Sequence, residues 1–153
     1  MMTQSSTPEE QRKFAVSCFN QVWNLLDKPD RTPEENIEMI HLAHASRYHW
    51  GQIGTPLNFA RGDWQISRIY ALLGFGVMSF KYAKFCLNLC EKHNLGDFDL
   101  AFAYEALARA SAVSGDIANA RGYLEMAEMT GHSIAKDDDR EYFLKELRSI
   151  NII

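Results

Sequence analysis

The stretch from Ala101 to Ile134 reads AFAYEALARASAVSGDIANARGYLEMAEMTGHSI, and its pattern decides the fold. The pattern has two halves on either side of Gly115, namely Tyr104-x2-Leu107-Ala108-x2-Ser111 and Ala120-x3-Leu124-x2-Ala127. Alanine-sized residues at such spacing let two helices approach closely, while the larger side chains fill the gaps between them. The stretch therefore predicts a hairpin of two antiparallel helices that turns at Gly115.

This pattern resembles the tetratricopeptide repeat, in which W-x2-L-G-x2-Y, A-x3-F and P recur with a period of about 34 residues. Each unit of that family is a pair of antiparallel helices that bury their apolar faces only by stacking on neighbouring units. The resemblance implies an all-helical stack with a concave face for a partner, and it implies no reaction. The chain departs from the family at His132, where the family prefers proline.

A second unit, over residues 58–93, can be aligned to the first. Before its turn at Gly74 the aligned residues are Ile66, Ser67 and Tyr70, which match Leu107, Ala108 and Ser111. Its return helix carries Ala83-x3-Leu87-x2-Cys90, which matches residues 120–127 only if about one helical turn is inserted after Gly74. The hairpin expected over residues 8–52 has the right shape without the pattern.

Three Thr-Pro pairs mark helix starts, at Thr7-Pro8, Thr32-Pro33 and Thr55-Pro56. Threonine is a good N-cap, and proline suits the first helical position because its missing N–H would have no helical partner there. Glutamate follows three residues after the first two threonines, at Glu10 and Glu35. This spacing predicts two full capping boxes.

Seven helices are predicted, over residues 8–27, 33–50, 56–73, 77–93, 98–114, 117–131 and 137–150. The predicted fold class is all-α. By the resemblance, it is a right-handed stack of about three antiparallel helical hairpins followed by a C-terminal capping helix. Residues 1–7 are expected to form a disordered tail, and residues 8–153 a single domain.

The composition argues against several functional classes. The 153 residues carry a net charge of −4, and they show no basic stripe of the kind that nucleic-acid binders present. No apolar run approaches the length of a membrane span, and the N-terminus lacks the apolar segment of a secretory signal. The three cysteines are simplest to explain as reduced thiols in the cytoplasm. We therefore expect neither nucleic acid nor membrane among the partners.

The resemblance also implies where a partner binds, because in that family the first helix of each hairpin lines the concave groove. Applied to the third and fifth predicted helices, the rule selects Arg61, Trp64, Arg68, Phe102, Glu105 and Arg109. Arginine or tryptophan would anchor the ligand, with guanidinium groups holding a carboxylate or a peptide end. Glu105 would orient Arg109, which lies four residues later. The alternative is a solvated face with local ion pairs.

Three histidines lie within nine residues of one predicted helix, at His41, His44 and His49. Glu38, His41 and His44 share a face, and Glu-x-x-His is the spacing that di-iron sites use in helix bundles. A second Glu-x-x-His is absent from the sequence. A metal site on these residues is therefore an alternative to the plainer interpretation, which is hydrogen bonding between packed helices.

Together these patterns favour a non-catalytic protein that binds a protein segment or peptide on its concave face, with no cofactor. A second hypothesis is a small-molecule or peptide sensor of a regulatory system, since similar repeats serve as ligand-binding halves of bacterial regulators. A third is a metal-dependent enzyme that uses Glu38, His41 and His44. The apolar chain end is expected to dock on the last hairpin or on a second copy, which would give a homodimer; its residues are Ile150, Ile152 and Ile153.

Overall fold

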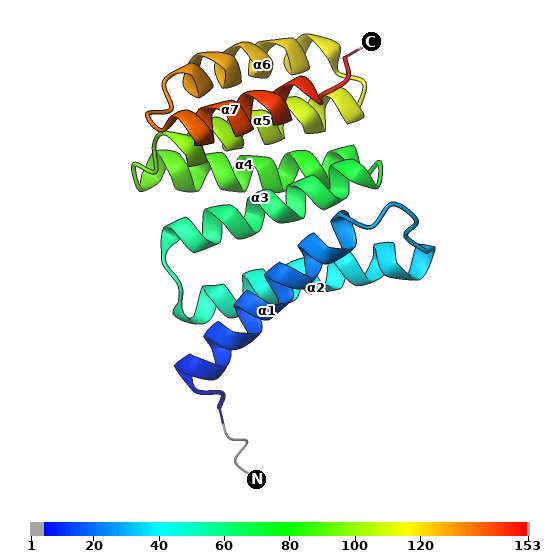
Figure 1. The fold of residues 1–153 in the computed structure, drawn as a ribbon, viewed down its shortest axis with the longest axis vertical. Helices are drawn as coiled ribbons and strands as arrows, with labels where there is room; N and C mark the ends of the chain where they lie inside the picture. Colours follow the sequence, from blue (N-terminus) through cyan, green and yellow to red (C-terminus); the bar gives the residue numbers. More distant parts are fainter. Residues whose placement is uncertain (1–4, 153) are drawn as a thin grey trace.

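The computed structural model describes residues 5–152, which fold into seven helices without a strand among them. The helices are α1 (Pro8–Leu26), α2 (Pro33–Ile53), α3 (Pro56–Leu72), α4 (Gly76–Lys92), α5 (Phe98–Val113), α6 (Ile117–His132) and α7 (Asp137–Arg148). Neighbouring helices pair into the hairpins α1–α2, α3–α4 and α5–α6, which stack along the long axis of the molecule with α7 at the C-terminal end (Figure 1). The predicted all-α class is confirmed.

The helix bounds agree closely with those expected from the sequence. Each predicted start is observed at its residue, except that α4 begins at Gly76 rather than Val77. The ends differ from the predicted ones by no more than three residues. Residues 1–4 of the predicted disordered tail lie outside the described residues, as does Ile153 of the apolar chain end.

The first predicted capping box is present. The Glu10 backbone N–H donates to the Thr7 hydroxyl oxygen at 3.1 Å, and the Thr7 N–H donates to the Glu10 carboxylate at 3.4 Å. At Thr32 only one half forms, because the Glu35 carboxylate instead accepts from Lys28 Nζ at 2.6 Å. The prediction of a second full box is therefore wrong, since an ion pair competes for its acceptor.

The second and third hairpins use the same turn. Gly74 and Gly115 have φ angles of +86° and +78°, in the left-handed region that favours glycine. In each turn, the N–H of the residue that follows the glycine donates to a carbonyl oxygen five residues earlier in the chain. Phe75 donates to Tyr70 at 2.8 Å, and Asp116 donates to Ser111 at 2.9 Å. These are Schellman C-caps. The two glycines are 41 positions apart (115 minus 74).

The same spacing continues into the return helices, since α4 and α6 each begin two residues after their turn glycine. Ser79 therefore takes the place of Ala120, and the extra helical turn expected after Gly74 is not there. Ser79 is fully buried, and its hydroxyl donates to the Ser67 carbonyl at 2.8 Å. A serine can fill an alanine-sized position in the core because its hydroxyl finds this partner.

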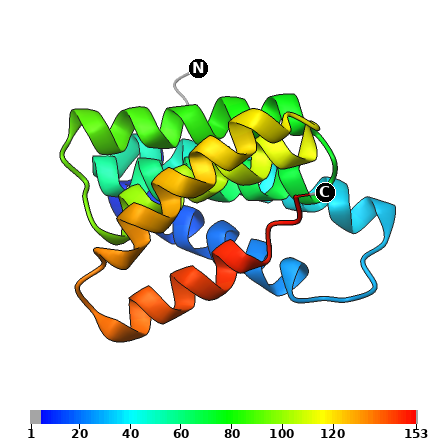
Figure 2. The same cartoon turned by 90° about the horizontal axis from the view of Figure 1, so that it is seen from above.

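The small residues that were predicted to let helices meet are in the core. Ala108, Ala120 and Ala127 are fully buried. The helices with odd numbers share one side of the stack: α3 packs on α5 and α5 on α7, and α1 and α7 lie on the side of the molecule opposite α4 (Figure 2). Between α1 and α3 the rings of Trp23 and Trp64 pack on each other, beside a hollow that both helices line.

Two further features of the described residues concern the character of the helices and the state of the cysteines. Within residues 5–152, no helix combines the length and the apolar character that crossing a membrane requires. The three cysteines, Cys18, Cys86 and Cys90, are free thiols. Cys86 and Cys90 are buried in the core between α3, α4 and α5.

Candidate functional site

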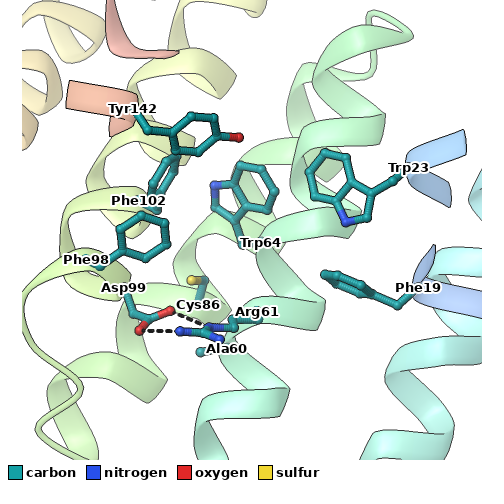
Figure 3. Close-up of a pocket in the computed structure, with 10 residues that line it drawn as sticks. All are labelled: Phe19, Trp23, Ala60, Arg61, Trp64, Cys86, Phe98, Asp99, Phe102 and Tyr142. Atoms are coloured by element: carbon teal, nitrogen blue, oxygen red, sulfur yellow. Dashed lines mark hydrogen bonds and ion pairs between the residues drawn. The ribbon is translucent and has the colours of Figure 1, made fainter. Parts of the chain in front are cut away.

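A recess with a volume of about 240 Å³ opens on the side of the odd-numbered helices (Figure 3). Its lining comes from α1, α3, α4, α5 and α7, and consists of Phe19, Trp23, Ala60, Arg61, Trp64, Cys86, Phe98, Asp99, Phe102 and Tyr142. Figure 3 shows Trp64 in the middle, with side chains of α5 and α7 on one side of it and those of α1 on the other. Six of the ten lining residues are aromatic, so we call this hollow the aromatic recess.

Trp64 is the centre of the aromatic recess. Its ring lies nearly parallel to that of Trp23, at an interplanar angle of 30° and a centroid distance of 5.9 Å. Phe102 packs on Trp64 edge to face, with 5.5 Å between the ring centroids. The ring of Phe102 also packs on those of Phe98 and Tyr142, at centroid distances of 4.7 Å and 6.0 Å. Each aromatic pair of this kind contributes about 0.5–1.5 kcal/mol beyond its buried area. Together they link α1 to α7 across the recess.

A second recess, of about 440 Å³, adjoins the first. Trp23, Trp64 and Tyr142 line both. The other lining residues of the second recess are Leu26, Asp27, Arg68, Leu72 and Glu146. The two recesses thus lie side by side between α1 and α7, and we call the pair the groove.

A buried carboxylate lies beneath the groove. Glu105 is fully buried, and it accepts hydrogen bonds from Trp64 Nε1 at 3.0 Å, Arg68 Nη1 at 3.2 Å and Arg109 Nε at 2.8 Å. A carboxylate without such donors would be expensive to bury, and charged donors make the strongest hydrogen bonds of this type. Glu105 thereby fixes the edge of the Trp64 ring.

The same arginines tie the floor of the groove to α7. Arg68 Nη2 donates to the Glu146 carboxylate at 3.1 Å. Arg109 Nη2 donates to the Glu146 carbonyl at 3.2 Å and to the Ser149 hydroxyl at 2.9 Å. The wall formed by α7 and the floor formed by α3 and α5 are therefore joined by one polar network.

Arg61 has its own carboxylate partner at the rim of the aromatic recess. Its Nε donates to Asp99 Oδ1 at 2.9 Å and its Nη2 to Asp99 Oδ2 at 3.3 Å, the two contacts drawn in Figure 3. The hydrogen bond to Asp99 is the main reason why the pKa of Arg61 is raised, and the nearby carboxylate of Asp139 adds to the effect. With Arg68 and Arg109 paired as above, every arginine of the site already has an acidic partner in the chain.

The six residues predicted to bind a partner are brought together, but in two layers. Arg61, Trp64 and Phe102 line the aromatic recess, and Arg68 lines the second recess. Glu105 and Arg109 line neither recess and lie behind the floor. Their predicted pairing is present as an ion pair of 2.8 Å, and burial lowers the pKa of Arg109. Whether any of the six contacts a partner stays a prediction.

Sequence reasoning found four of the fifteen lining residues of the groove and missed the rest. Most of the missed lining residues lie on α1 or at its C-cap, on α5 and on α7, and these include Phe19, Trp23, Asp27, Phe98, Asp99, Tyr142 and Glu146. The rule that the first helix of each hairpin lines the concave side was applied only to the third and fifth helices. Its extension to the first and seventh would have found both walls, since Phe19 and Trp23 lie four residues apart on one helix face.

Two of the three histidines of α2 join this helix to its neighbours. His44 Nε2 lies 2.9 Å from the Tyr70 hydroxyl of α3, and His49 Nδ1 hydrogen-bonds to Gln11 of α1. Burial is the main cause that lowers the pKa of His44, with the charge of His41 adding to it. Across residues 5–152, no group of three or more potential ligands is arranged to hold a metal ion, and this includes the set proposed with Glu38.

Comparisons with protein-family models, with curated proteins and with solved structures found no match. The resemblance to tetratricopeptide repeats therefore stays a prediction from the sequence. The observed spacing of the two turn glycines, 41 positions (115 minus 74), is longer than that family's period of about 34 residues. Function has to be argued from the geometry of the groove itself.

Proposed function

We propose that this protein is a non-catalytic binding module, and that the groove holds a segment of a partner protein. The observation that carries the proposal is the adjoining pair of recesses, which share Trp23, Trp64 and Tyr142. Tyrosine, tryptophan and arginine are the residues that most often dominate binding energy at protein interfaces. Tyr142 and Leu72, at 50% and 47% exposure, would bury additional apolar surface in a complex.

The two-part shape of the groove favours a chain segment over a small molecule. Small-molecule sites usually enclose about 300–1,000 Å³; the aromatic recess, at about 240 Å³, is below that range, and the second recess, at about 440 Å³, is within it. A segment that places one side chain in the aromatic recess and continues into the second recess would use both. A sensor of a small ligand is thus the lesser alternative. A cytoplasmic location accords with the proposal, since the free thiols would stay reduced there.

Site-specific photocrosslinking tests the proposal. Tyr142 is replaced by p-benzoylphenylalanine in the full chain, which is then irradiated in a lysate of the host. We expect a discrete crosslinked protein whose attachment peptide maps to one segment, because Tyr142 borders both recesses.

The matched control places the same crosslinker at Tyr48. That tyrosine is 62% exposed on α2 and lines neither recess. If Tyr142 yields no product beyond those obtained at Tyr48, the groove is not the partner site and the proposal fails.

A further inference from the structure

The charges around the groove are unequal, and their arrangement indicates the chemistry of the ligand. Three guanidinium groups belong to the site, on Arg61, Arg68 and Arg109. Five carboxylates surround or underlie it, on Asp27, Asp99, Glu105, Asp139 and Glu146. Three positive against five negative charges leave a net charge of −2.

The excess charge is located at two places. Asp99, Glu105 and Glu146 are paired with the arginines. Among the described residues, neither Asp27 nor Asp139 has an ion-pair partner. Asp27 lines the second recess. Asp139 lines neither recess, but it lies three residues before Tyr142 on the same face of α7, and its charge acts on Arg61 at the rim of the aromatic recess. The unpaired carboxylates therefore lie at the two ends of the groove, with the aromatic side chains between them.

Tyr142 lies between these two ends, and the carboxylates around the groove affect the pKa of its hydroxyl. Burial is the main cause that raises the pKa of its hydroxyl, and the carboxylates of Glu146, Glu105 and Asp27 raise it further, with Arg68 opposing them. A ligand with positive charges would meet a favourable potential here. Positive side chains could also pack on the exposed ring of Tyr142 and on the half-buried ring of Trp23, since cations are attracted to aromatic faces.

For an acidic ligand or a free peptide carboxylate, the same potential would be unfavourable. It would have to displace Asp99 from Arg61, or Glu146 from Arg68, and so exchange one ion pair for another. The displaced Asp99, whose side chain is only 15% exposed, would then be left partly buried without its partner. The arginines are thus already occupied, and the apolar recess and the unpaired carboxylates are what the groove still offers.

We infer that the groove binds a segment with one bulky apolar side chain, held in the aromatic recess, and lysine or arginine residues on both sides of it. The inference rests on the proposed function and specifies its ligand. Aromatic and long aliphatic side chains suit the recess because they fill it and match its lining. The flanking basic residues pair with Asp27 and Asp139.

A displayed library of random peptides of about 12 residues, selected on the full chain, gives the test. We expect the enriched sequences to share one aromatic or large aliphatic residue flanked by lysine or arginine. A synthetic form of the best sequence should lose on the order of tenfold in affinity when that residue is changed to alanine, as central anchors do. Changing its basic residues to glutamate should weaken binding by a similar factor, on the order of tenfold.

Charge reversal on the protein makes the test specific. Asp27→Lys and Asp139→Lys should each lower the affinity for the basic peptide and raise the affinity for its glutamate version. Glu34 is exposed at the start of α2, and Glu34→Lys should change neither affinity. Enriched peptides that are acidic, or that need a free C-terminal carboxylate, would overturn the inference and leave the proposed function standing. If no peptide is enriched, or if Tyr142→Glu binds every enriched peptide as well as the native chain, the proposed function fails with it.

Discussion

Glu105 shows how much a single position can depend on residues far away in the sequence. It is fully buried, and two of its three donors, Trp64 and Arg68, come from another helix. The sequence predicted the pair with Arg109 because the two are four residues apart on one helix. It gave no sign that the carboxylate lies under the groove, because helical spacing describes one helix face and not what covers it.

Replacing Glu105 with glutamine should therefore be costly, although the shape is retained. Two guanidinium groups would lose their shared negative partner, and we expect the free energy of unfolding to fall by about 2–4 kcal/mol. Urea unfolding followed by circular dichroism measures this. Glu125→Gln, at an exposed position of α6, should change it by less than about 0.5 kcal/mol. Equal stability of the two variants would contradict the role assigned to Glu105.

Asp63 gives a pH dependence of defined sign. Its side chain is 6% exposed, and burial raises its pKa from 3.8 to about 6, although Arg47 at 3.0 Å acts in the opposite direction. Because the folded pKa is above the unfolded one, the folded state holds the proton more tightly. The contribution of Asp63 to stability is therefore greatest below about pH 4 and is lost as the pH rises through about 6.

Asp63→Asn removes this titration. A shift of roughly two pKa units corresponds to about 3 kcal/mol, so the variant should gain about 2–3 kcal/mol relative to the native chain between about pH 4 and pH 7. Chemical denaturation of both proteins over that pH range provides the comparison. A difference that stays constant with pH would show that Asp63 titrates normally in the fold.

The helices themselves were largely predictable, because their starts are encoded locally. Threonine caps, prolines and turn glycines act within a few residues, and the observed starts follow them. The register of α4 was not predictable in this way. It depends on Ser79 being buried against Ser67 of α3, and a serine is normally read as a surface residue.

Replacing either of two glycines of α6 with alanine should change the stability of the fold, in opposite directions for the two positions. A Cβ at Gly131 would collide with the ring of Phe143, which seats α7, whereas a Cβ at Gly122 meets nothing within 4 Å. We expect Gly131→Ala to lower the free energy of unfolding by about 1–3 kcal/mol, as overpacked cores do. Gly122→Ala should raise it by up to about 1 kcal/mol through helix propensity.

Thermal unfolding of both α6 variants tests this, and hydrogen exchange should show faster exchange of α7 amides in Gly131→Ala alone. Stabilisation by both substitutions would mean that α7 is not seated on Gly131.

On the scale of the whole molecule, the core is unevenly distributed along the stack. Helix α5 has nine buried residues, and α1 has only two, Ala15 and Val22. The aromatic recess lies where α1 faces α3, and the rings of Trp23 and Trp64 meet there. The sequence could not show this, because the separation of α1 from α3 depends on the bulk of Trp23 and Trp64 meeting between them.

Hydrogen exchange should follow this distribution. We expect the amides in the middle of α5 to exchange most slowly and those of α1 to exchange faster, since local opening of α1 exposes less apolar surface. Mass spectrometry of peptic fragments measures both in one experiment. Uniform protection from α1 to α7 would indicate that the chain opens only as a single unit.

The way in which Trp64 is held has a consequence for the kinetics of recognition. Glu105 fixes one edge of the indole and Trp23 packs on one face, so the side chain has little rotamer freedom left to lose when a ligand binds. A receptor that is preorganised to this degree avoids much of the ordering entropy that accompanies association. Encounter should therefore proceed in one kinetic step, without an isomerisation that limits the rate at high ligand concentration.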